Sequence, residues 1–134
     1  MILRGDPYVV PVGFAYADGK VLFHTCSKGL KMEALKQNSN VCFEVDETLS
    51  DATMSKSVII FGKTEIIEDE QKMIPCLQRL IDKYRVPLGF DEYMHKPGRN
   101  RESELRAARI CVITPTKITG RKLLPKEELH SGST

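Results

Sequence analysis

The dipeptide Asp18-Gly19 is the feature that most narrows the folds open to this chain. It lies between two runs rich in apolar residues, Tyr8–Tyr16 and Lys20–Thr25, and Asp-Gly in such a place is the strongest short-range signal for a β-hairpin. A tight hairpin turn joins antiparallel strands, whereas parallel strands need a long crossover connection. The first two predicted strands are therefore an antiparallel pair.

Four further segments have the pattern of strands and two have that of helices. Val41–Asp46 alternates apolar and polar residues, and Ser57–Ile67 is the longest apolar run, with Gly62 predicting a bend or bulge in its middle. The other predicted strands are 108–113 and 117–123, the predicted helices are 30–38 and 73–85, and 87–101 is predicted to be a loop. Because most strands are joined without crossover helices, we expect a mainly β fold, an antiparallel barrel with two accessory helices.

The length and charge of the chain limit the number of domains and the classes of partner that we expect. With 134 residues, 41% of them apolar, the chain is expected to form one domain over residues 1–124, followed by a polar tail at 125–134. The net charge is only +2, and the most basic stretch also contains glutamates, so we expect no nucleic-acid partner. No stretch has the roughly 18 apolar residues of a membrane span and no signal peptide is evident, so we expect no membrane partner and a cytoplasmic protein. The four cysteines are widely spaced, which favours free thiols over disulfides, with Cys42 and Cys111 as core residues.

The segment from His24 to Lys31 has the composition of an anion site. The predicted strand ends in Thr25, and Ser27, Lys28 and Gly29 lead directly into the predicted helix. The first N–H groups of a helix are unpaired and carry partial positive charge, so they attract anions such as phosphate. We therefore expect a phosphorylated ligand here, with Lys31 as its strongest single contact.

The predicted first strand has one bulky face, with Tyr8, Val10, Val12, Phe14 and Tyr16, and one small face. We expect the bulky face to point into the core. The small residues are Val9, Pro11, Gly13 and Ala15, which leave room for a flat ligand or for another backbone. Pro11 has no N–H group, so this strand is either an ordinary sheet edge or faces a ligand or partner at that point. The two interpretations are equally open from the sequence.

An ordered set of motifs resembles one protein family. The motifs are Asp6-Pro-Tyr-Val-Val-Pro-Val12, Phe23-His-Thr25, Gly29-Leu-Lys31, Asn40-Val-Cys-Phe-Glu-Val45, Ser57-Val-Ile-Ile-Phe-Gly-Lys63 and Ile118-Thr-Gly120. Together they resemble the pyridoxamine-phosphate-oxidase-like FMN-binding split barrels, and among these the nitroimidazole-resistance (Nim-like) proteins. The resemblance implies a six-stranded antiparallel Greek-key split barrel that forms a homodimer, with two FMN molecules between the subunits.

The resemblance also implies which residues bind FMN. The backbone of Val9, Val10, Pro11 and Val12 would line the flavin ring. The phosphate end would be surrounded by His24, Thr25, Lys28 and Lys31, and the neighbouring long strand would bring Ser57 and Val58 to the cofactor. His24 is also the candidate catalytic residue, because its ordinary pKa near 6.5 would let it donate a proton during reduction.

Two departures from the family pattern modify these expectations. Family members usually have a strand before the Asp-Pro-Tyr motif, and only Met1–Gly5 precede it here, so this strand is either shortened or the chain begins late. True pyridoxamine phosphate oxidases carry a C-terminal substrate-binding segment with Arg and His, which has no counterpart in this sequence. We therefore do not expect oxidation of vitamin B6 compounds.

The resulting expectation is an FMN-dependent oxidoreductase that passes electrons from a reduced donor to a small acceptor, with nitroaromatic reduction as the subgroup's activity. A flavin-binding or flavin-sensing protein without turnover is one alternative, and a haem-binding split barrel with His24 or His95 as axial ligand is another. A structural dimer without cofactor is a third. We expect no metal site, because the histidines and cysteines lack compact ligand spacing.

Overall fold

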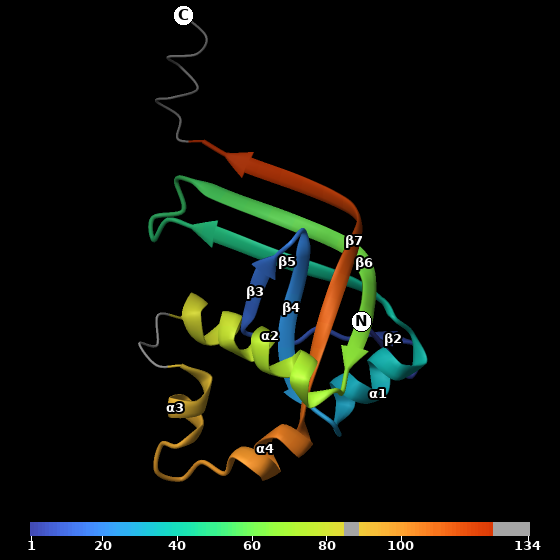
Figure 1. Cartoon of the computed structure of the whole chain (residues 1–134). Coiled ribbons are helices and arrows are strands. Elements are labelled where there is room, and N and C mark those ends of the chain that lie inside the picture. The colour runs from blue at the N-terminus through green and yellow to red at the C-terminus, as the bar shows by residue number, and fades with distance from the viewer. Residues whose placement is uncertain (85–88, 125–134) are drawn as a thin grey trace, which may run out of the picture.

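The computed structural model describes residues 1–84 and 89–124 (Figure 1). Five strands form one antiparallel sheet in the order β3-β4-β7-β6-β5. They are β3 Phe14–Ala17, β4 Lys20–Cys26, β5 Asn40–Thr48, β6 Ser55–Ile67 and β7 Ala108–Leu123. A separate two-stranded sheet pairs β1 Ile2–Leu3 with β2 Asp6–Pro7. The helices are α1 Leu30–Gln37, α2 Glu70–Lys83, α3 Phe90–Met94 and α4 Arg101–Ala107.

The predicted fold class is confirmed: the protein is mainly β, antiparallel, with accessory helices. The described part of the chain has seven strands where the sequence predicted six, because the two predicted C-terminal strands are one strand and β1 and β2 were not expected. The predicted tail at 125–134, the predicted end of the second helix at 85 and residues 87–88 of the predicted loop lie outside the described residues.

The Asp18-Gly19 turn forms as predicted. Ala17 pairs with Lys20 across it, and Asp18 and Gly19 have φ values of 53° and 75°. Two successive residues with positive φ are typical of the two-residue hairpin turn whose twist matches that of its strands.

Gly62 marks a bend in the two longest strands. It pairs with Pro115, and the register between β6 and β7 shifts between Phe61 and Gly62. A Cβ atom on Gly62 would lie 2.5 Å from the carbonyl oxygen of Thr114, so only glycine allows this close approach. Both strands bend sharply along their length (Figure 1). The predicted bulge is confirmed, and Pro115 is accommodated at it without ending β7.

The bend divides the sheet into a barrel and an extension. The extension consists of residues 44–48, 55–59 and 119–123, which pair with one another and project past the β3–β4 hairpin (Figure 1). Most of its side chains are exposed, and Leu49, Ile118 and Leu123 beside or within it are large apolar residues with 45 to 54% of their surface exposed.

The sheet has a separate core on each of its faces. The inner core is Val21, Phe23, Leu35, Ile60, Cys111 and Ile113. Phe14 on β3 and Phe43 on β5 pack against it with their rings in edge-to-face contact, the centroids 5.0 Å apart. Because β3 and β5 are the two outer strands of the sheet, this contact shows that the sheet curls until its edges meet. The barrel is therefore closed by side chains instead of by a further hydrogen-bonded ladder.

The outer core lies between the sheet and three helices. Helix α2 crosses β3, β4 and β7 (Figure 1), and its Met73 and Leu80 pack against Leu22 and Ile110 of the sheet. The helix begins three residues earlier than predicted because Asp69 caps it, accepting hydrogen bonds from the N–H groups of Gln71 and Lys72. Within the described residues, no helix is long and apolar enough to cross a membrane.

Two expectations about particular segments are wrong, and a third holds only in part. The predicted loop contains α3 and is followed by α4, whose buried residues Phe90, Met94 and Leu105 join the outer core. The expected core face of the first strand is only partly correct, because Tyr16 is 61% exposed while Ala15 is buried against the outer core. All four cysteines are free, but only Cys111 is a core residue, and burial raises its pKa to about 11.

Candidate functional site

The turn between β4 and α1 leaves the start of the helix uncapped. Gly29 precedes α1 with φ at 120°, a conformation that residues with side chains rarely adopt, and no side chain caps the helix. The first N–H in the helical ladder is that of Glu33, which bonds to the carbonyl of Gly29. The preceding N–H groups of the first turn therefore remain available to an anion, as the sequence predicts.

Two of the predicted cations flank this helix start. Lys28 is exposed beside Gly29, and Lys31 is half-buried in the first turn. Thr25 is the buried polar residue of β4, and His24 next to it is in the opposite position of the strand. The pKa of His24 is lowered, first by partial burial, then by the positive charges of Lys31 and Arg99. His24, Lys31 and Arg99 therefore share one electrostatic environment, and neutral imidazole is favoured.

The other sequence-predicted residues lie elsewhere. Val9, Val10 and Val12 line a small hollow of about 50 Å³ against the inner core, while Pro11 is exposed. Ser57 and Val58 lie in the extension, where they pair with Asp46 and Val45. Within one chain the structure thus brings His24, Thr25, Lys28 and Lys31 together, and it does not bring Ser57 and Val58 to them.

A much larger pocket, of about 530 Å³, also has His24 in its lining. The strand β4 supplies one wall through His24, Thr25 and Cys26, and helices α2, α3 and α4 supply most of the rest. The lining is completed by four residues that lie outside the helices, Gly13, Tyr84, Arg99 and Ala108. The helical walls are mostly apolar, with side chains of Leu77, Leu80, Ile81, Phe90, Met94 and Leu105. This volume is in the range of small-molecule sites.

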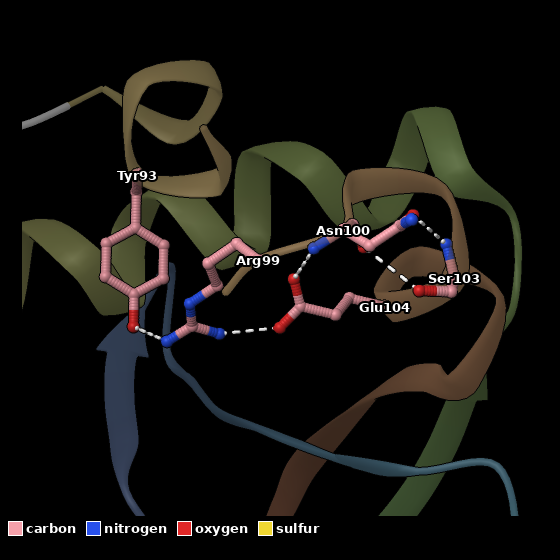
Figure 2. Close-up of polar contacts among 5 residues, drawn as sticks. All are labelled: Tyr93, Arg99, Asn100, Ser103 and Glu104. Carbon is pink, nitrogen blue, oxygen red and sulfur yellow. Dashed lines mark hydrogen bonds and ion pairs between the residues drawn. The ribbon is translucent and has the colours of Figure 1, made fainter. Parts of the chain in front are cut away.

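The polar groups of the helical wall form one network that sequence reasoning missed. The guanidinium of Arg99 donates to the hydroxyl of Tyr93 on one side and to Glu104 on the other (Figure 2). The second carboxylate oxygen of Glu104 accepts the N–H of Asn100, whose own side chain caps α4 at the N–H of Ser103 (Figure 2). The spacing of Asn100, Ser103 and Glu104 was the available signal, since it is typical of a helix start.

Comparison with known proteins identifies the family. The model of the pyridoxamine 5'-phosphate oxidase family matches residues 1–122. The chain belongs to the pyridoxamine 5'-phosphate oxidase family. The resemblance found in the sequence motifs is thereby confirmed. No curated protein shows significant similarity to the chain.

Solved structures of the family share the fold. A protein from Bacteroides thetaiotaomicron described as a putative 5-nitroimidazole antibiotic resistance protein has a TM-score of 0.68 and 24% identity, over 90% of this chain and 72% of that one. A FAD-binding protein from Mesorhizobium loti has a TM-score of 0.64 and 24% identity, over 89% and 79%. A FAD and haem binding protein from Mycobacterium smegmatis has a TM-score of 0.72 and 18% identity, over 98% and 69%. Because these identities are below 25%, the similarity to the three structures establishes the fold of this chain and nothing more.

Proposed function

We propose that this family member binds FMN with its phosphate at the N-terminus of α1, and that it is an FMN-dependent oxidoreductase reducing a small nitroaromatic acceptor. The observation that carries the proposal is the uncapped helix start between Lys28 and Lys31. Free N–H groups, the helix dipole and two ammonium groups all favour a phosphate at this place. The names of the similar structures from Bacteroides and Mesorhizobium support a flavin and a nitro compound as ligands.

The segment before β3 fits the flavin ring. In the described part of the chain, the backbone groups of Val9–Val12 make no hydrogen bond, although Tyr8 and Phe14 on either side do. Unpaired backbone groups on a segment with small and β-branched side chains suit the polar edge of a flat heterocycle. When bound, the flavin supplies the electron-transfer chemistry, and the residues of the chain bind, orient and shield it.

The proposal includes a homodimer with the flavin between subunits. The extension is exposed and carries the apolar side chain of Leu123, with Ile118 next to it. Among the described residues, β7 pairs only with β6 in this region. An exposed apolar surface of this kind is typical of an interface. A dimer would also explain the position of Ser57 and Val58, which would then serve the flavin site of the other subunit.

The overall reaction balances with a nicotinamide donor. NAD(P)H, a proton and the nitro compound give NAD(P)⁺, the nitroso compound and water, a two-electron reduction. In this scheme His24 would protonate the acceptor as imidazolium, and its lowered pKa makes that form the minor one at pH 7.

The first test is cofactor binding. We expect the purified protein to carry, or to take up, FMN that stays with it through gel filtration at the elution volume of a dimer. FAD contains the same phosphorylated riboflavin and is titrated in parallel. A protein that remains colourless with both flavins would contradict the proposal.

The phosphate assignment is tested with a matched pair of lysines on α1. Lys31→Ala removes a charged hydrogen bond to the phosphate and should weaken FMN binding roughly ten- to a hundredfold. Lys36→Ala removes the same charge from the exposed last turn of the same helix and should leave the Kd unchanged. Equal affinities in the two variants would show that the phosphate lies elsewhere.

Steady-state turnover with NAD(P)H and a nitroaromatic compound separates an enzyme from a flavin-binding protein. If turnover is found, His24→Ala tests the proton-donor role, and an unchanged kcat in that variant would exclude the role.

The visible absorption spectrum of the purified protein also tests haem, the second candidate, which is favoured by the name of the Mycobacterium smegmatis structure. Of the two candidate axial ligands, His24 lines the large pocket and His95 does not, since its ring nitrogen bonds to the carbonyl of Asp91 in α3. A Soret band would support haem binding, and its loss or shift in His24→Ala would support His24 as the ligand.

A further inference from the structure

The large pocket between β4 and helices α2, α3 and α4 is a separate feature from the helix start. It shares only His24 and Thr25 with the proposed phosphate site, and neither Lys28 nor Lys31 lines it. Its walls combine aliphatic side chains with three aromatic rings, those of Tyr84, Phe90 and Tyr93. Such walls favour an apolar, flat molecule over a small ion.

Arg99 gives the pocket a fixed donor group. Its guanidinium lies 4.5 Å from the centroid of the Tyr93 ring and donates to the Tyr93 hydroxyl at 2.5 Å and to Glu104 at 2.7 Å. These bonds hold it between α3 and α4 (Figure 2). Of the five N–H groups of a guanidinium, two are used here, and the rest have no protein partner in the described part of the chain.

The charges around the pocket favour an anion. Glu104 is the acidic residue of the lining, and both of its carboxylate oxygens are already engaged, by Arg99 and by the N–H of Asn100. His24 lines the pocket from β4 with neutral imidazole favoured, and the positive charge of Lys31 acts on His24 although Lys31 does not line the pocket. An anionic group that reaches Arg99 would therefore meet donors and no free carboxylate.

We propose that this pocket binds an aromatic carboxylate, with the ring system between the apolar helical walls and the carboxylate on Arg99. Guanidinium and carboxylate match each other in geometry, so Arg99 would select the anion over a neutral ligand of the same shape. The proposal goes beyond the flavin function and does not depend on it. A ligand in this pocket would lie next to His24, which also borders the proposed phosphate site.

The test uses two ligands of the same shape, one an anion and the other neutral. Calorimetric titration of the purified full-length chain, with whatever cofactor it retains, is carried out with 2-naphthoate and with 2-naphthamide. We expect naphthoate to bind at least tenfold more tightly than the neutral amide. Arg99→Gln should weaken naphthoate binding roughly ten- to a hundredfold and leave naphthamide binding unchanged.

Two further variants guard against a trivial loss of structure. Arg106→Gln removes an exposed arginine from α4 that does not line the pocket, and should leave both affinities unchanged. Arg99→Lys keeps the charge without the forked geometry and should bind naphthoate with intermediate affinity. Circular dichroism and the Tm of each variant show whether it is folded.

The outcomes are distinct from those of the flavin experiments. Equal affinity for the two ligands in the wild-type protein, or no binding of either, would overturn the proposal. Equal loss of naphthoate binding in the folded Arg99→Gln and Arg106→Gln variants would overturn it too, because the effect would then be one of overall charge. Naphthoate binding in a protein that takes up no flavin would support this pocket while contradicting the proposed function.

Discussion

At the scale of single residues, His24 connects the two proposed ligand sites. It projects from β4 into the wall of the large pocket and carries a lowered pKa, caused by partial burial and then by Lys31 and Arg99. All three causes disfavour the imidazolium. The pKa of His24 is therefore sensitive to both cations, Lys31 at the helix start and Arg99 between α3 and α4.

This arrangement predicts the direction in which mutations move the His24 pKa. Arg99→Gln removes one of the two positive charges and should raise the pKa toward its ordinary value, measured by NMR titration of the imidazole resonances. The control is Arg106→Gln, which should not change it. An unchanged pKa in Arg99→Gln would mean that Arg99 is too far from His24 to line the same pocket.

The same shift predicts how stability depends on pH. The unfolded chain takes up a proton at His24 near pH 6.5, whereas the folded chain takes it up only at lower pH. Between these values the unfolded state binds more protons, so the free energy of unfolding falls as the pH falls. Urea unfolding at pH 7 and pH 5 should therefore show a smaller loss of stability in His24→Gln than in the wild type.

At the scale of secondary-structure elements, the short helix α4 positions Arg99. The first turn of α4 is capped by the side chain of Asn100, which accepts the N–H of Ser103 (Figure 2). The carboxylate of Glu104 accepts hydrogen bonds from the N–H of Asn100 and from the guanidinium of Arg99. A seven-residue helix has little stability of its own, so its cap and its buried Leu105 carry much of its energy.

Removing this cap should destabilise the protein and also disturb the position of Arg99 in the pocket. We expect Asn100→Ala to lower the free energy of unfolding by about 0.5–2 kcal/mol, measured by urea denaturation. Asn100→Asp keeps the accepting oxygen and should retain most of the stability. If Asn100→Ala and Asn100→Asp were equally stable, the cap would not contribute.

The elements also show what the sequence could and could not predict. The Asp18-Gly19 hairpin, the alternation in β5 and the bulge at Gly62 depend on neighbours in the chain, and they were predicted correctly. Helices α3 and α4 were missed because each has fewer than eight residues, too few for periodicity to emerge. Their apolar residues matter only through contact with α2 and the sheet.

The same limit applies to the candidate site. The helix start at residues 28–31 is local and was predicted with its uncapped N–H groups. Arg99 lies 75 residues after His24 in the sequence, and only the docking of α3 and α4 on the barrel brings both to one pocket. No pattern in the sequence indicated that pair.

At the scale of the whole molecule, the barrel depends on a contact between the two outer strands. Phe14 and Phe43 meet edge to face across the gap that no hydrogen-bonded ladder spans. Such aromatic pairs contribute about 0.5–1.5 kcal/mol beyond the area that they bury.

Removing the Phe14–Phe43 contact should weaken the closure of the barrel between β3 and β5. Phe43→Leu keeps an apolar side chain and removes the ring, so we expect the free energy of unfolding to fall by about 0.5–1.5 kcal/mol in urea denaturation. Tyr16→Leu, an exposed aromatic residue on β3 outside the pair, is the control and should change it less. Equal effects would mean that the aromatic contact does not hold the edges together.

The order of the strands in the sheet has a consequence for folding during synthesis. The last strand of the described chain, β7, lies in the middle of the sheet, between β4 and β6. During synthesis, the β3–β4 and β5–β6 hairpins emerge first and can each pair locally, but each presents an open edge until residues 108–123 leave the ribosome. Until then the nascent chain has two separate hairpins with unpaired, aggregation-prone edges. The pairing of β7 with β4 and β6 joins the hairpins and covers these edges.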